Sequence, residues 1–135
     1  MPGSFFQIYI QIVFAVKGRQ NFLLPLIEQE IYKYMSGIIK GKEQKPLAIN
    51  GMPDHIHILV GLKPVMRISD LVRNIKNNPT NFINAKNWLK QKFSWQEGYG
   101  TFSYSQSNFG NVIDYIKNQK NIMKNFLLKK SIFHF

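Results

Sequence analysis

Apolar and polar residues alternate with a period of two near the start of the chain. Between Phe6 and Val16 every even position is apolar, whereas Gln7, Tyr9 and Gln11 begin the opposite face. Successive side chains of a β-strand point to opposite faces, so this alternation predicts a long strand with one strongly buried face.

Apolar residues recur at helical spacing in three later segments. Pro25 can open a first helix, which Gly41 ends. We expect Ser69 to cap a second helix and Pro79 to kink or break it, because proline removes a backbone hydrogen bond and clashes with the preceding turn. A last helix is expected from Val112 to about Leu128.

Two short apolar runs, Leu47–Met52 and His55–Leu62, are separated only by a Pro-Asp pair, which predicts a β-hairpin. A further strand is expected around Thr101–Ser105. The order is therefore β-α-β-β-α-β-α, with no internal repeat and no linker. It predicts the α+β class, with an antiparallel sheet and packed helices of ferredoxin-like or RNA-recognition-like (RRM-like) type.

Composition agrees with one folded domain over residues 1–135. The chain is 44% apolar and only 19% charged, far from the balance of disordered chains. It has no cysteine, which excludes disulfide scaffolds, thiolate metal sites and cysteine nucleophiles and fits a reducing cytoplasm. The apolar start lacks a basic leading region and contains glutamines, so we expect neither a signal peptide nor a membrane span.

Charge points to a polyanionic partner. The chain has 18 Lys and Arg against 7 Asp and Glu, and the basic excess lies mainly after Val60. Nucleic acid is the first candidate partner and an anionic membrane surface is the second, since phosphates attract Lys and Arg irrespective of sequence. Candidate DNA contacts in this half are Arg67, Arg73, Lys76, Lys90, Lys92 and Trp95. The alternative is that the aromatic residues are core and the lysines merely solvated.

Two of the three histidines, His55 and His57, occupy alternate positions of a predicted strand. Both imidazoles should therefore lie on one face, where they could bind one divalent metal and leave positions open for substrate oxygens. The alternative is a pair of strand histidines that are hydrogen-bonded to neighbours.

Tyr115 and Gln119 are four residues apart on the predicted last helix and should lie on one face of it. Tyrosine can act as a covalent nucleophile, and an amide oxygen is an acceptable ligand for Mg²⁺ or Mn²⁺. The alternative for Tyr115 is simple packing.

These pieces occur together in a known family. The stretches QIYIQIVFAVKGR, LAINGMPDHIHILVGLKP, ISDLVRNIK, FSWQEGYGTFSYS and VIDYIKNQ, in this order, closely resemble the IS200/IS605-type transposases, which are single-domain HUH enzymes with one tyrosine. The resemblance runs from about Gln7 to Gln119. It implies an enzyme that mobilises insertion sequences as single-stranded DNA.

By position, the resemblance implies that His55, His57 and Gln119 hold a divalent metal, Mg²⁺ or Mn²⁺. It implies that Tyr115 attacks the scissile phosphate and forms a 5′-phosphotyrosine. It also implies homodimers in which the tyrosine helix of one subunit can complete the histidine site of the other, with no membrane partner.

The end of the chain departs from the family. After the tyrosine motif many relatives have a histidine pair, whereas this chain continues with residues 120–123, Lys-Asn-Ile-Met, and has a short or truncated tail. Two alternatives to a working transposase therefore stay open. One is a nucleic-acid-binding remnant that has lost turnover, and the other is a domesticated HUH nuclease that does not transpose.

Overall fold

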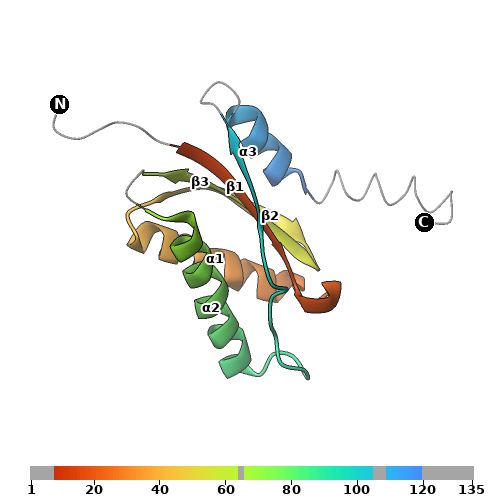
Figure 1. Cartoon of the computed structure of the whole chain (residues 1–135). Helices are drawn as coiled ribbons and strands as arrows, with labels where there is room; N and C mark the ends of the chain where they lie inside the picture. The colour runs from red at the N-terminus through yellow and green to blue at the C-terminus, as the bar shows by residue number, and fades with distance from the viewer. Residues whose placement is uncertain (1–7, 64–65, 105–108, 120–135) are drawn as a thin grey trace, which may run out of the picture.

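The computed structural model describes residues 8–63, 66–104 and 109–119 of the chain (Figure 1). After β1 a short 3-10 turn spans Lys17–Arg19. The strands and longer helices are β1 (Ile8–Ala15), α1 (Pro25–Gly41), β2 (Lys45–Met52), β3 (His55–Leu62), α2 (Ile68–Lys86), β4 (Gly100–Tyr104) and α3 (Phe109–Lys117). The order βαββαβα is the one predicted from the sequence.

The four strands form one antiparallel sheet in the order β2-β3-β1-β4. The chain leaves β1, crosses through α1 to the far edge strand β2, and returns through the hairpin so that β3 lies between β1 and β2. This split βαβ arrangement is that of the ferredoxin-like fold. The predicted fold class is confirmed.

α1 and α2 cover one face of the sheet (Figure 1). The even positions of β1 point into this layer, and Ile12, Phe14 and Val16 are buried there. Ile31 of α1 and Ile75 of α2 are fully buried against them. The period-two strand and the helical stripes were thus predicted correctly, because both periods report the same apolar core.

α3 packs on the opposite face (Figure 1). Its Val112 and Ile116 form a small buried cluster with Tyr9 of β1, Ala48 of β2 and Leu59 of β3. The odd positions of β1 and β3 therefore face α3. Because His55 and His57 are odd positions of β3, this face is the one that carries the candidate chemistry.

The expected cap of α2 is wrong. The helix begins at Ile68, one residue before Ser69, and its N-cap residue is Arg67, which makes no side-chain capping hydrogen bond. Ile68 packs against the main core, and this contact starts the helix earlier. Asp70 in the first turn supplies a favourable charge at the helix N-terminus.

The expected break at Pro79 is also wrong, because α2 runs on to Lys86. Pro79 is buried, so its packing offsets the backbone hydrogen bond that it cannot donate. Side-chain bonds also hold this turn, since the Lys76 carbonyl accepts from Trp95 Nε1 at 3.0 Å and from Thr80 Oγ1 at 2.6 Å.

Some element bounds differ from expectation. β2 begins earlier, at Lys45, with a register irregularity between Pro46 and Ala48. α3 begins at Phe109 instead of Val112. The rest of the predicted last helix beyond residue 119, and the short tail, lie outside the described residues.

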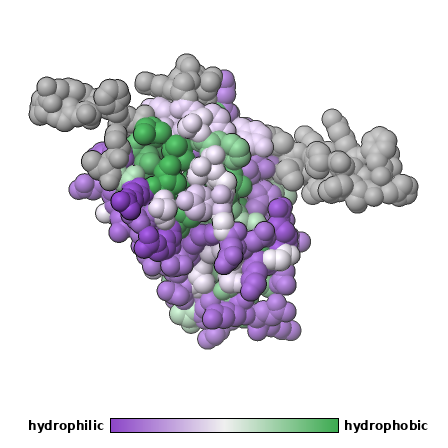
Figure 2. Space-filling view, viewed as in Figure 1, coloured by the Kyte–Doolittle hydropathy of each residue, from purple (hydrophilic) through white to green (hydrophobic). Residues whose placement is uncertain are grey.

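The surface of the molecule differs from region to region. In the view of Figure 1 the lower part, over α2, is mostly hydrophilic, whereas apolar residues gather higher, over the sheet (Figure 2). Within residues 8–63, 66–104 and 109–119, no helix is long and apolar enough to cross a membrane.

Candidate metal and nucleophile site

The two histidines lie on β3, a central strand of the sheet. His57 is paired with Val13 of β1 and Asn50 of β2, and the ring centroids of His55 and His57 are 5.1 Å apart. His55 is buried and His57 is half-buried. The sheet therefore holds both imidazoles close together on the α3 face, as the spacing predicted.

His55 is held by a charged pair. Its Nδ1 lies 2.7 Å from Asp54 Oδ1, while Arg19 Nε donates to Asp54 Oδ2 at 2.9 Å. Burial alone would raise the pKa of Asp54, but the hydrogen bonds and charges of His55 and Arg19 lower that pKa below its usual value. Asp54 is therefore a carboxylate at neutral pH and orients the His55 ring.

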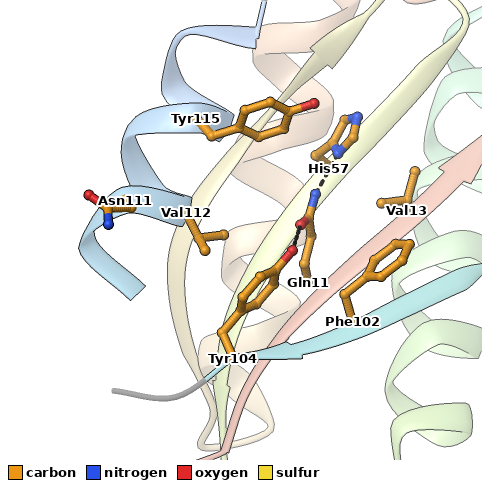
Figure 3. A pocket seen from close by; sticks show the side chains of 8 residues that line it. All are labelled: Gln11, Val13, His57, Phe102, Tyr104, Asn111, Val112 and Tyr115. Carbon is orange, nitrogen blue, oxygen red and sulfur yellow. Dashed lines mark hydrogen bonds between the residues drawn. The ribbon is translucent and has the colours of Figure 1, made fainter. Parts of the chain in front are cut away.

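His57 is held by a neutral chain of hydrogen bonds. Its Nδ1 lies 2.6 Å from Nε2 of Gln11, and Tyr104 Oη donates to Gln11 Oε1 at 2.8 Å (Figure 3). Both histidines thus use Nδ1 for an internal contact. No described residue makes a hydrogen bond to either Nε2, which leaves these two nitrogens for a ligand.

His57 is neutral at physiological pH. Burial, and then the proximity of His55, lower the pKa of His57 to about 4. A metal binds only an imidazole nitrogen that carries no proton. The low pKa of His57 therefore favours metal binding over protonation.

Tyr115 extends from α3 toward His57, and the two ring centroids are 6.3 Å apart (Figure 3). The tyrosine is 45% exposed, so its hydroxyl can reach a substrate. The helix is held in place by its buried Val112 and Ile116 and by Asn50 Nδ2, which donates to the Lys117 carbonyl at 2.9 Å. Asn50 is the β2 partner of His57, so this bond ties the tyrosine helix to the strand position beside the site.

Gln119 lies two residues beyond α3 and is 2% exposed. Its Oε1 has no hydrogen-bond partner among the described residues. A buried acceptor without a donor is costly, and a cation is one way to satisfy it. The structure thus brings His55, His57 and Tyr115 together, while no hydrogen bond joins Gln119 to them in the described part of the chain.

The available donors fit a metal that accepts nitrogen and oxygen. Two imidazole nitrogens and one amide oxygen suit Mn²⁺ and are acceptable to Mg²⁺. In the described ranges no group of three His, Cys, Asp or Glu could hold a metal ion. Among the described residues a third protein ligand would therefore be of another type, and the amide oxygen of Gln119 is one candidate.

A hollow of about 630 Å³ lies beside the site (Figure 3). It is bounded by β1, β3, β4 and α3, and its lining residues are Gln11, Val13, His57, Phe102, Tyr104, Asn111, Val112 and Tyr115. A second hollow of about 420 Å³ borders both histidines, Arg19 and residues 96–99. His57 therefore borders two hollows, and His55 borders the second.

Four of the predicted DNA contacts are exposed. Arg67 and Arg73 lie at the start and on the surface of α2, the helix that covers the other face of the sheet, and Arg73 forms an ion pair with Asp70. Lys90 and Lys92 lie in the segment that joins α2 to β4. The structure places none of the four beside the histidines, and their contact with DNA stays a prediction.

Lys76 and Trp95 have internal partners. Lys76 Nζ donates to the carbonyls of Gln96 at 3.0 Å and Gly98 at 2.8 Å, and burial lowers the pKa of Lys76. Trp95 packs edge to face on Phe14, with ring centroids 4.7 Å apart. Both residues hold the segment that borders the second hollow, and any contact with DNA stays a prediction.

Sequence reasoning did not assign a role to Gln11, Arg19, Asp54 or Tyr104. Asp54 directly precedes His55, so that signal was available in the sequence. The hydrogen bonds that link Tyr104 through Gln11 to His57 depend on strand register, since β1 lies between β3 and β4. Spacing along the chain could not reveal it.

Comparisons with known proteins show which proteins this chain is similar to. Residues 4–119 match the family model described as transposase IS200 like. The ISDra2 transposase TnpA of Deinococcus radiodurans is 23% identical over 122 residues, which cover 87% of each chain.

Two solved structures share the fold. One is a crystal structure of a Deinococcus radiodurans R1 chain described as a transposase, with a TM-score of 0.71 and 23% identity over 88% of this chain and 95% of that one. The other is a REP-associated tyrosine transposase bound to a REP hairpin, with a TM-score of 0.63 and 17% identity over 88% of this chain and 70% of that one.

Proposed function

Because the chain belongs to the IS200-like transposase family, we propose that it cleaves and rejoins single-stranded DNA at the ends of an insertion sequence, with Tyr115 as the nucleophile. The observation that carries this proposal is the position of Tyr115. Its exposed ring lies 6.3 Å from the ring of His57, whose imidazole is neutral at physiological pH. A tyrosine that only packed a helix would not need this neighbour.

We propose that a divalent cation, Mg²⁺ or Mn²⁺, is held by Nε2 of His55, Nε2 of His57 and Oε1 of Gln119. This assignment is supported by the buried Oε1 of Gln119 and by the two Nε2 atoms, none of which has a hydrogen-bond partner in the described part of the chain. When bound, the cation would polarise the scissile phosphate and stabilise the charge that develops on its oxygens. Asp54 and Gln11 would hold the two imidazoles in orientation.

In the proposed reaction Tyr115 Oη attacks the scissile phosphorus and the bond from phosphorus to the 3′-oxygen breaks. The phenol loses its proton and the leaving 3′-oxygen gains one, so the products are a 5′-phosphotyrosine and a 3′-hydroxyl. The 3′-hydroxyl of a second strand end can then attack the phosphotyrosine, which restores the phenol. Each step exchanges one phosphodiester for another, so no nucleoside triphosphate is needed.

We propose single-stranded DNA as the partner, in the cytoplasm where bacterial DNA lies. The net charge of +11 supplies salt-dependent attraction for a phosphate backbone. The REP-associated relative is bound to a hairpin, so folded single strands are the first substrates to test here. We also propose that the chain forms a homodimer.

The test uses labelled single-stranded oligonucleotides that cover both flanks of the gene, incubated with Mg²⁺ or Mn²⁺. We expect a covalent protein–DNA adduct that survives denaturation and maps to Tyr115. Tyr115→Phe removes one oxygen and should abolish the adduct while DNA binding persists. The matched control is Tyr34→Phe, since Tyr34 is exposed on α1 on the far side of the sheet.

The two functional alternatives give results that differ from those of a working transposase. A remnant would bind the oligonucleotides and form no adduct. A domesticated nuclease would cleave them and leave no covalent protein. An adduct that persists in Tyr115→Phe and maps to another residue would contradict the proposed nucleophile.

A further inference from the structure

We infer that Gln11 is a positioning residue which, together with Tyr104, selects the nitrogen of His57 that carries the proton, and that the Gln11 amide turns over when a divalent cation binds. The inference rests on the proposed metal site. It concerns two residues that touch neither the cation nor the substrate in that proposal.

Gln11 lies between its two partners on the face that carries the site. It is 4% exposed, while Tyr104 on edge strand β4 is half-buried. Gln11 Oε1 accepts from Tyr104 Oη at 2.8 Å, and Gln11 Nε2 contacts His57 Nδ1 at 2.6 Å. Both ends of a buried amide are thus used, which fixes the side chain in place.

This direction of hydrogen bonding conflicts with metal binding. An amide nitrogen can only donate, so His57 Nδ1 must accept and the proton of the neutral ring must be on Nε2. Nε2 has no hydrogen-bond partner among the described residues and is the nitrogen that would face the cation. In this arrangement His57 therefore presents a proton where a ligand requires a lone pair.

A half-turn of the amide removes the conflict. The oxygen and nitrogen of an amide are similar in size, so turning it leaves the packing around Gln11 unchanged. Oε1 would then accept from His57 Nδ1–H, and Nε2 would donate to Tyr104 Oη. The Nε2 atom of His57 is thereby freed for the cation, as in other metal sites where the second nitrogen of the histidine donates to a protein oxygen.

Tyr104 makes both orientations possible, because a phenol oxygen can donate to Oε1 or accept from Nε2. His55 has no such choice. Its partner Asp54 is a carboxylate that can only accept, so the proton of a neutral His55 stays on Nδ1. The two histidines therefore differ, with His55 preset for a ligand and His57 switchable.

The test follows the ring protons of His57 by ¹⁵N NMR and measures Mn²⁺ affinity by calorimetry, both without DNA. In the metal-free wild type we expect the His57 proton on Nε2, and with Mg²⁺ on Nδ1. Gln11→Glu presents two acceptor oxygens, so the proton should move to Nδ1 even without metal. Gln11→Leu should lower Mn²⁺ affinity about 10- to 100-fold, and Gln11→Glu should restore it.

Tyr104→Phe provides a second variant that removes a single oxygen from a half-buried ring. We expect it to lower Mn²⁺ affinity several-fold without unfolding the protein, whereas the control Tyr34→Phe should have no effect. If Gln11→Leu does not fold, the proton position in Gln11→Glu and the affinity of Tyr104→Phe still decide the matter.

The inference is overturned if the His57 proton is on Nδ1 in the metal-free wild type, or if Gln11→Leu folds and binds Mn²⁺ as tightly as the wild type. Neither readout needs catalysis. A wild type that shows the proton shift but forms no DNA adduct would contradict the proposed function alone. An adduct-forming wild type with an unchanged His57 proton would contradict this inference alone.

Discussion

The two histidines of the site differ in their surroundings although they are two residues apart. His55 contacts a carboxylate that is itself paired with Arg19, whereas His57 contacts the neutral amide of Gln11. Burial lowers the pKa of His57 to about 4. Ionisation of His57 therefore makes the site sensitive to pH between about 6.5 and 4.

We expect the metal-free protein to lose stability as the pH falls from about 6.5 to about 4. The pKa of His57 is about 4 in the folded protein and near 6.5 in the unfolded chain, so the unfolded chain binds the proton first. The stabilising contribution is therefore complete above pH 6.5 and is lost as the pH approaches 4. After allowance for partial exposure it amounts to about 1–2 kcal/mol.

Urea unfolding of wild type and His57→Gln at several pH values measures this contribution. The free energy of unfolding of the wild type minus that of the variant should decrease as the pH falls from 7 to 4. Groups remote from His57 titrate equally in both proteins and cancel. Parallel curves over this range would show that the folded protein does not depress the pKa of His57.

At the residue scale the sequence predicted that the two histidines share a face, but it did not predict the side chains that hold them. The spacing of His55 and His57 on a strand was enough to predict a shared face, because strand alternation is a local property. The contact between Gln11 and His57 joins two residues that are 46 positions apart and lie on different strands. It depends on pairing register, which no local pattern specifies.

At the scale of elements, the hairpin of β2 and β3 positions His55. Gly51 pairs with Ile56, and a Cβ at Gly51 would lie 2.2 Å from the carbonyl oxygen of His55. Backbone cannot move aside as a side chain can. The close approach of the two strands at this point therefore requires glycine.

We expect Gly51→Ala to lower the free energy of unfolding by about 3 kcal/mol, as other overpacked positions do, and to weaken metal binding because His55 must shift. Gly37→Ala is the matched control. Gly37 lies in α1 with open space around its Cα, so alanine there should stabilise the protein by up to about 1 kcal/mol. Chemical denaturation of both variants measures these free energies of unfolding. Equal stability of Gly51→Ala and wild type would contradict this hairpin geometry.

Elements were predictable where periodicity was long and failed where tertiary contacts overrode local rules. The strand containing Ile8–Ala15 and the helix Pro25–Gly41 follow their apolar patterns. At Pro79 the local rule predicted a break, but burial of the proline and the bonds to the Lys76 carbonyl kept α2 continuous. These contacts come from Trp95 and from the core, and the sequence of the helix alone does not reveal them.

At the scale of the whole molecule, the described basic side chains do not act alike. Lys76 is bound to two carbonyls, whereas Lys90 and Lys92 are exposed. Exposed lysine and arginine side chains displace counterions from the nucleic acid when they contact its phosphates. Each such contact with a single strand changes the slope of log affinity against log salt by about 0.7. A lysine that bonds the protein itself contributes little to this slope.

We expect Lys90→Gln with Lys92→Gln to reduce the slope of log affinity against log salt by about 1.4 for single-stranded DNA. Lys76→Met should leave the slope unchanged and lower the melting temperature, because the segment before β4 loses its tie to α2. Fluorescence anisotropy at four salt concentrations measures the slope. A slope that falls in Lys76→Met and not in the double variant would reverse these roles.

The histidines and the tyrosine of one proposed active site can come from the same chain or from two chains. In the single chain Tyr115 already lies beside its own His57, and α3 is fixed there by Val112, Ile116 and the bond from Asn50 to the Lys117 carbonyl. We therefore expect each chain to complete its own site. Exchange of α3 between subunits, which the family resemblance implies, would have to break and remake all these contacts.

Mixing two inactive variants tests the expectation. His55→Ala retains the tyrosine, and Tyr115→Phe retains the histidines, so only a subunit pair that exchanges α3 contains one intact site. With tags of different size on the two chains, co-purification shows whether mixed dimers form, and the gel shows which chain carries DNA. We expect no adduct although mixed dimers form. An adduct on the His55→Ala chain would demonstrate exchange, because in that chain Tyr115 can act only beside the histidines of the other subunit.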